Sequence, residues 1–209
     1  MSVPRIEGQS RVDGIKAQHV GVYHKMCFEV GRVDPVEADV DLLIVGMPII
    51  PALEDPAQST CELDRALLGT LSHLRAGGIF KGDFGETLIL SSLPAPVRAR
   101  SILIIGMGLA AEITPGIMGN LAGIAARAAI PLDSCTIACL LALPNGDATP
   151  ASIAQTAQHM MDHMLDAMDA CHDPTRFTDR RWIFDLRTPH DTYVQSHFQS
   201  VIDRRGGAG

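Results

Sequence analysis

Residues 99–129 read ARSILIIGMGLAAEITPGIMGNLAGIAARAA and combine a strand, a glycine turn and a helix. The first part is a nearly continuous apolar run that ends in Gly106-x-Gly108, which is typical of a strand buried on both faces. Thr114 and Pro115 then supply a helix N-cap and a first helical residue. A strand buried on both faces needs helices on both sides, so this segment predicts a layered α/β fold.

The rest of the chain repeats this alternation. Apolar runs predict further strands, and N-cap signals followed by helical spacing predict further helices. We therefore expect a three-layer α/β/α sandwich with a mixed, mostly parallel sheet of five or six strands and four helices. We expect residues 1–18 to be a tail or edge extension and residues 19–209 to form a single α/β domain. The expected strands are 19–31, 40–47, 86–93, 100–108, 135–143 and 182–186, and the expected helices start near 59, 115, 150 and 191.

Composition excludes several classes of protein. The 209 residues are 46% hydrophobic and carry a net charge of −7. This acidic balance argues against general nucleic-acid binding, which needs clustered Lys and Arg. The longest apolar run, 135–143, is too short for a membrane helix, and the N-terminus lacks the apolar core of a signal peptide. The five cysteines indicate free thiols in a reducing cytoplasm.

The glycine turn is a candidate ligand site. Gly106, Met107, Gly108 and Thr114 could place backbone amides and a helix N-terminus against a phosphate. The third glycine of a dinucleotide fingerprint is absent, and Glu112 would repel an anion there. The alternative is a tight exit from the strand.

Two histidines on a predicted helix are weak candidates for a metal site. His159 and His163 have the i, i+4 spacing of a helical metal pair, but Met160 stands where a metalloprotease has Glu. They also fit the solvated face of an amphipathic helix. Cys135 and Cys139 would lie about 13 Å apart on a strand, too far apart to share a metal. We therefore expect no metal and no cofactor.

A charged turn raises the question of acid–base chemistry. Lys81, Asp83 and Glu86 stand close together between a predicted helix and a predicted strand. The neighbouring glycines favour a turn instead, with Phe80 and Phe84 anchored in the core and the charges facing water. We favour the turn. No catalytic residue is predicted anywhere in the chain.

The segments LDRALLGTLSHLRAGGIFKGDFGETLIL (63–90) and 99–129 together resemble the N-terminal domain of the leucyl (cytosol) aminopeptidase family. The resemblance covers about residues 40–143 well and continues weakly through the third helix. Its motifs are structural, so they indicate a fold more than an activity. The matching positions are Leu63, Asp64, Phe80, Gly82, Gly85, Glu86, Gly106, Gly108 and Thr114.

The resemblance implies a macro-domain-like fold without catalysis. In that family the metal ions and peptidase residues belong to a C-terminal domain, and none of its motifs occurs here. The chain is therefore expected not to be an aminopeptidase by itself. Macro domains, which share the fold, bind ADP-ribose. This chain has Gly46-Met47-Pro48 where many of them carry the asparagine that supports hydrolysis.

These observations favour a non-catalytic, cytoplasmic, stand-alone module with a protein-interaction or regulatory role, which binds a protein partner or its own copy. The first alternative is a binder of ADP-ribose or another nucleotide through the Gly106–Gly108 loop. The second is one part of an aminopeptidase whose catalytic domain is a separate chain. None of the three involves a membrane or nucleic acid.

Overall fold

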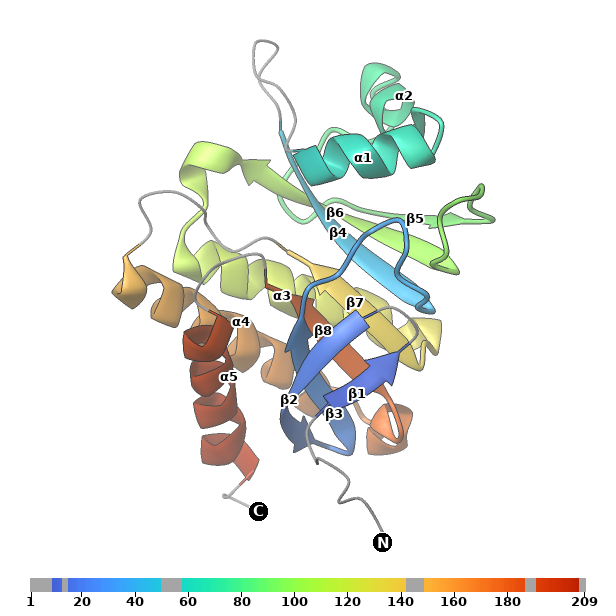
Figure 1. Ribbon diagram of the computed structural model, residues 1–209. Coiled ribbons are helices and arrows are strands. Elements are labelled where there is room, and N and C mark those ends of the chain that lie inside the picture. Colours follow the sequence, from blue (N-terminus) through green and yellow to red (C-terminus); the bar gives the residue numbers. More distant parts are fainter. Residues whose placement is uncertain (1–8, 13–14, 50–57, 142–148, 187–190, 207–209) are drawn as a thin grey trace, which may run out of the picture.

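The computed structural model describes residues 9–12, 15–49, 58–141, 149–186 and 191–206. A β-sheet runs through the centre of the molecule (Figure 1). Its eight strands have the order β1-β2-β3-β8-β7-β4-β6-β5. The four pairs from β3 to β6 are parallel, and the three outer pairs are antiparallel. The strands are β1 (Gln9–Val12), β2 (Ile15–Tyr23), β3 (Met26–Gly31), β4 (Leu42–Ile49), β5 (Thr87–Ser91), β6 (Ser101–Leu109), β7 (Thr136–Leu140) and β8 (Arg181–Asp185).

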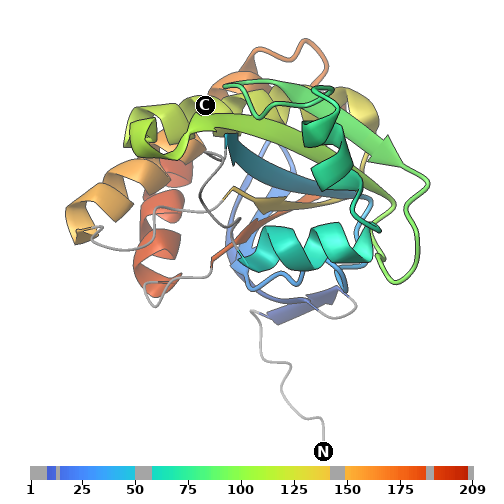
Figure 2. The ribbon, with the colours of Figure 1, turned by 90° about the horizontal axis from the view of Figure 1, so that it is seen from above.

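Helices cover both faces of this sheet, which confirms the predicted three-layer sandwich (Figures 1 and 2). The shorter helices, α1 (Gln58–Ala66) and α2 (Thr70–Ala76), lie on one face. The longer helices, α3 (Pro115–Ala129), α4 (Pro150–Asp169) and α5 (Asp191–Gly206), lie on the other. None of the helices in the described ranges is long and apolar enough to cross a membrane.

Each face of the sheet has its own hydrophobic core. Leu42 and Ile44 of β4 pack with α3, α4 and α5, whereas Leu43 and Val45 pack with α1 and α2. This alternation follows from the period of two along a strand, and it explains why β4 is apolar at every position.

The helix starts expected near 115 and 150 were read correctly. The Thr114 hydroxyl accepts a hydrogen bond from the Ile117 amide, and the Thr149 hydroxyl accepts one from the Ser152 amide. Each threonine therefore satisfies an amide at a helix start that would otherwise lack a partner.

Two expected elements are each divided in the structure. The strand expected over 19–31 is a hairpin, because His24 and Lys25 adopt φ values of 45° and 67° and turn β2 into β3. The single helix expected from residue 59 is broken into α1 and α2, because Leu68 and Gly69 adopt φ values of 57° and 79°. The N-terminal segment, expected as a tail or edge extension, contains β1 and the start of β2.

Candidate functional site

The chain changes direction across the sheet between β4 and β7, which are neighbours. After β4 it continues to α1 and α2 on one face, and after β7 it continues to α4 on the other face. In open α/β sheets such a switch point leaves a crevice at the carboxyl ends of the strands, where ligands commonly bind. The end of β4 is therefore the first place to look for a site.

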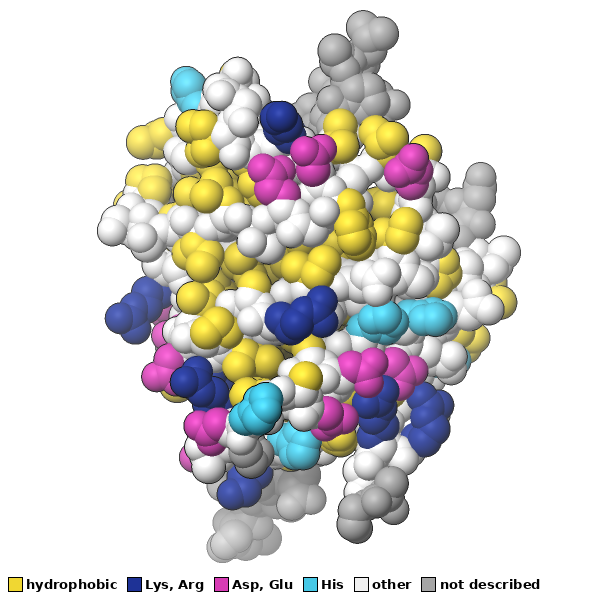
Figure 3. All heavy atoms as spheres, turned by 180° about the vertical axis from the view of Figure 1, so that it is seen from behind, with side chains coloured by type: hydrophobic (Ala, Val, Ile, Leu, Met, Phe, Trp, Pro, Cys, Tyr) yellow, Lys and Arg dark blue, Asp and Glu magenta, His cyan; other side chains and the backbone are white. Residues whose placement is uncertain are grey.

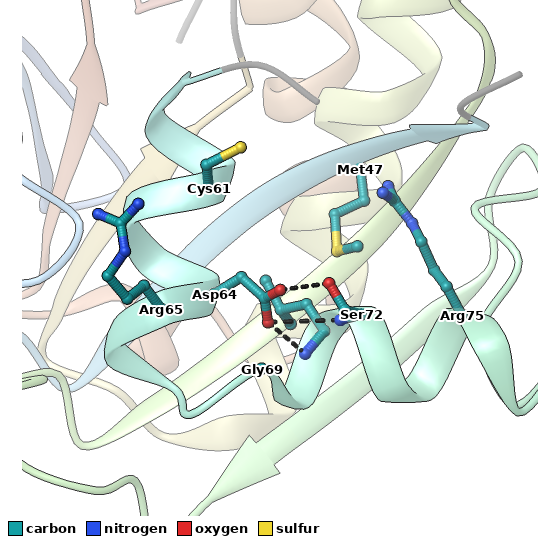
Figure 4. Close-up of a pocket in the computed structure, with 8 residues that line it drawn as sticks. Met47, Cys61, Asp64, Arg65, Gly69, Ser72 and Arg75 are labelled. Atoms are coloured by element: carbon teal, nitrogen blue, oxygen red, sulfur yellow. Dashed lines mark hydrogen bonds between the residues drawn. The ribbon is translucent and has the colours of Figure 1, made fainter. Parts of the chain in front are cut away.

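A cavity of about 220 Å³ lies beside this end of β4, between α1 and α2 (Figure 4). Met47 projects into it from β4, and Arg75 reaches up from the last turn of α2. Apolar and polar groups share the wall. The lining residues are Met47, Cys61, Asp64, Arg65, Gly69, Leu71, Ser72 and Arg75.

Asp64 builds the floor of this cavity by holding the two helices together. One carboxylate oxygen accepts hydrogen bonds from the amides of Leu71 (2.8 Å) and Ser72 (3.3 Å). The other accepts one from the Ser72 hydroxyl (2.5 Å). A carboxylate at these free amides stabilises the start of α2. Asp64 therefore has a structural role, which agrees with the structural motif that carries the family resemblance.

Arg75 is the unusual residue of the cavity. Its Nη2 donates to the Pro48 carbonyl at 2.9 Å, and its Nε is buried with no acceptor among the residues that the structure describes. Burial lowers the pKa of the guanidinium, and the negative charge of Asp64 opposes that shift. A partly buried cation with an unused donor can receive an anion.

The Lys81–Glu86 segment is the turn that the sequence favoured. The Glu86 carboxylate accepts hydrogen bonds from the amides of Lys81 (2.9 Å), Gly82 (2.9 Å) and Asp83 (3.2 Å). This carboxylate stabilises the turn and is not part of an acid–base pair with Lys81. Phe80 is buried as expected, but Phe84 is 49% exposed, so the expectation that it anchors the turn in the core was wrong.

The predicted glycine loop lies inside β6. Gly106, Met107 and Gly108 are buried, and Thr114 is exposed at the start of α3. The Gly106 amide donates to the Glu86 carbonyl at 2.7 Å, and the Gly108 amide donates to the Gly82 carbonyl at 2.9 Å. Both amides thus already have acceptors within the chain. Ligand binding at these four residues stays a prediction.

His159 and His163 lie side by side on α4, with ring centroids 6.2 Å apart. Both pack against Gly119 of α3, where a Cβ would come within 3.0 Å of each of them. Within the described ranges, no group of three His, Cys, Asp or Glu residues could hold a metal ion. The histidines therefore contribute to the α3–α4 contact, and the expectation that they hold no metal stays a prediction.

The fold also joins a cysteine and a histidine that the sequence did not connect. The Cys27 thiol lies 3.3 Å from His19 Nδ1, and the buried Glu29 beside them pairs with Arg181 at 2.5 Å. Burial raises the pKa of the Cys27 thiol, and the charge of Glu29 raises it further. Because nucleophilic catalysis needs a thiolate, this pair is poorly suited to it. Only the β2–β3 hairpin register, which no local motif signalled, brings the pair together.

A second cavity, of about 230 Å³, lies near the ends of β3 and β8 and is lined by Lys16, Gln18, Val30, Gly31, Arg32 and Leu186. Lys16 and Arg32 make it cationic, so an anionic group could bind there. Neither residue was a candidate at the sequence level, because isolated Lys and Arg residues are usually solvated.

Residues 49–165, more than half of the chain, match the model described as "Cytosol aminopeptidase family, N-terminal domain". The chain belongs to this family. The match includes α1, α2 and the Glu86 turn, which are the elements built by Asp64 and Glu86. No curated protein matches the chain.

Solved structures show the same fold at low sequence identity. The Oceanobacillus iheyensis macrodomain with ADP has a TM-score of 0.62 and 12% identity, and the match covers 94% of this chain and 100% of that one. A tomato leucine aminopeptidase mutant has a TM-score of 0.62 and 18% identity, with 94% of this chain covered. Only 38% of the tomato chain is covered, so this cytosol aminopeptidase module spans a minor part of that enzyme.

Proposed function

We propose that this chain is a non-catalytic module that acts by binding a protein, and that this protein is a second copy of itself. The observation that carries the proposal is the open edge of the sheet at β5. This strand pairs with β6 on one side, and it ends the strand order on the other.

Exposed hydrophobic side chains gather near this edge. Of the seven large hydrophobic residues that are exposed in the described part of the chain, five lie between residues 68 and 109. Phe84, Ile89 and Leu109 are 49%, 46% and 42% exposed. The face behind the sheet shows hydrophobic side chains across its middle (Figure 3). An apolar area of this kind beside an unpaired strand is typical of an interaction surface.

The β5 edge has none of the features that normally prevent pairing. Natural edge strands carry charges, prolines or bulges that block an incoming strand. Between Glu86 and Arg98 the chain has no charged residue, and the prolines at 94 and 96 come after β5 has ended. Within the strand, TLILS, Thr87 and Ile89 are residue types with high β-propensity.

The sequence of β5 suits pairing with itself. In an antiparallel pair centred on Ile89, each Ile89 meets its own copy, and each Thr87 meets Ser91 of the other chain. These three side chains are exposed on the same face of β5. Apolar pairs and Thr–Ser pairs are both favourable across strands. Two-fold symmetry therefore covers Ile89 with no need for a different partner.

The test is the mass of the protein in solution, measured by sedimentation velocity or light scattering over a range of concentrations. We expect wild type at about twice the monomer mass of 22.4 kDa. Ile89→Lys should shift it to the monomer, because a charge at an edge blocks pairing. Val22→Lys is the matched control, since Val22 is 54% exposed on β2 and should leave the dimer intact.

A wild-type monomer at high concentration would refute self-association. It would leave a different protein as the partner, including a separate chain that carries an aminopeptidase catalytic domain. An Ile89→Lys protein that still dimerises would place the interface elsewhere on the molecule.

The family description supports a cytoplasmic location for this module.

Nucleotide binding is the second candidate, and two observations favour it. The fold matches a macrodomain whose structure contains ADP, and the second cavity presents Lys16 and Arg32. ADP-ribose at about 100 times its Kd would stabilise the folded protein by about 2.7 kcal/mol, which raises the Tm by about 5–11 °C. Loss of this shift in Arg32→Ala would place a phosphate group of the ligand at the second cavity, which is too small to hold the whole nucleotide. Loss only in Gly108→Glu would place it at the predicted loop.

A further inference from the structure

The cavity between β4, α1 and α2 has no part in the proposed self-association. Its most unusual group is Arg75, which has no carboxylate within salt-bridge distance among the described residues. A guanidinium carries five N–H groups, and within the described ranges the acceptor for Arg75 is a single one, the Pro48 carbonyl. Arg75 is partly buried, so its guanidinium has lost part of its hydration, and a bound anion would offset that loss.

The size of the cavity limits the ligand. Pockets for drug-sized molecules have volumes of about 300–1,000 Å³, and a cavity of about 150 Å³ holds benzene. The volume of about 220 Å³ falls between them. The cavity is therefore too small for a nucleotide, but it can hold a short side chain with one polar head group.

The walls limit the chemistry. Met47 and Leu71 offer apolar contact, and Arg75 offers a positive charge. The other arginine of the lining, Arg65, extends away from Arg75 (Figure 4). The carboxylate of Asp64 also lines the cavity, so a multiply charged anion such as phosphate would be repelled. Asp64 already accepts three hydrogen bonds, so it has little remaining capacity for a ligand amino group.

From these features we infer that the cavity binds a small monocarboxylate with a short apolar side chain, of the size class of a free hydrophobic amino acid. The carboxylate pairs with the guanidinium of Arg75, and the apolar side chain lies against Met47 and Leu71. The carboxylate is the main determinant of affinity, and the amino group adds little.

Isothermal titration calorimetry with four probes tests this inference: L-leucine, 4-methylpentanoate, 3-methylbutylamine and inorganic phosphate. The first two should bind with Kd values within a few-fold of each other, and the last two should not bind. If no carboxylate binds at millimolar concentration, or if phosphate binds as well as leucine, the inference is wrong.

Variants locate the binding. Arg75→Gln should weaken leucine binding at least about tenfold, because a hydrogen bond to a charged group contributes that much. Arg75→Lys keeps the charge and loses the planar fork, so its affinity for leucine should lie between those of wild type and Arg75→Gln. Arg127→Gln is the control, since Arg127 is an exposed arginine of α3, on the opposite face of the sheet from this cavity.

Unchanged affinity in both Arg75 variants would refute the site even if leucine binds. Because Ile89 lies at the edge of the sheet and not in this cavity, Ile89→Lys should leave leucine binding unchanged. The tests can therefore refute the carboxylate site and the dimer independently of each other.

Discussion

Gly106→Ala is the sharpest test of how β6 is packed. A Cβ at Gly106 would lie 2.0 Å from the Asp83 carbonyl oxygen and 2.8 Å from the Gly82 carbonyl carbon. Both contacts are with backbone, so no side chain can rotate away. The turn has no free direction either, because a Cβ on Gly82 would already lie 3.1 Å from the backbone of Met47 and Pro48.

The cost of this methyl group follows from what must move. The turn would have to leave β6 and lose the hydrogen bonds from Gly85 to Gly106, from Gly106 to Glu86 and from Gly108 to Gly82. Each contributes about 0.5–1.5 kcal/mol, and overpacking adds about 1–3 kcal/mol. We therefore expect a loss of about 3 kcal/mol or more, which lowers the Tm of a chain of this size by about 6–12 °C or more.

Thermal unfolding followed by circular dichroism measures the effect. Gly116→Ala is the matched control, because a Cβ there meets nothing within 4 Å and a helix favours Ala over Gly. Its Tm should stay equal or rise by about 1–4 °C. A Gly106→Ala protein with the wild-type Tm would refute the close packing of the Glu86 turn on β6.

Two further predictions concern titratable groups. Burial raises the pKa of Asp169, but hydrogen bonds from His24 and Tyr23 outweigh it and hold that pKa below its usual value. The resulting stability is present above the unfolded-state pKa of about 3.9, and it is lost as the pH falls through the folded-state pKa. Asp169→Asn should therefore flatten the fall in Tm below about pH 4. An unchanged slope of Tm against pH would contradict this. Burial raises the pKa of the Cys139 thiol to about 12, whereas Cys135 is exposed. Iodoacetamide should therefore alkylate Cys135 in the native protein and Cys139 only after unfolding. Mass spectrometry of the alkylated protein measures this difference.

The strands that the sequence predicted well are those buried on both faces. β4, β6 and β7 were found because two cores need apolar residues at every position. The hairpin between β2 and β3 was missed because its turn residues, His24 and Lys25, are not the Gly or Asn that usually adopt positive φ. Phe177 stacks on His24 at a centroid distance of 6.2 Å, which is a tertiary contact at this turn that local sequence does not signal.

The helix break at Gly69 was missed for a different reason. The leucines at 63, 67 and 71 continue a helical pattern across the break, and all three are buried. The hydrogen bonds from the Leu71 and Ser72 amides to Asp64 close the corner. A residue that looked like part of one helix face therefore caps the next helix, which hydrophobic periodicity alone does not reveal.

The sequence by itself determined the alternation of buried strands and capped helices, and the turn at Glu86, because these depend on residues close together in the chain. Only the tertiary structure decided which strand lies at the edge, that Arg75 meets the carbonyl of Pro48, and that Cys27 meets His19. The order of strands in a sheet and contacts between separate elements depend on how the layers pack, and local patterns of hydrophobicity and turn residues do not encode them.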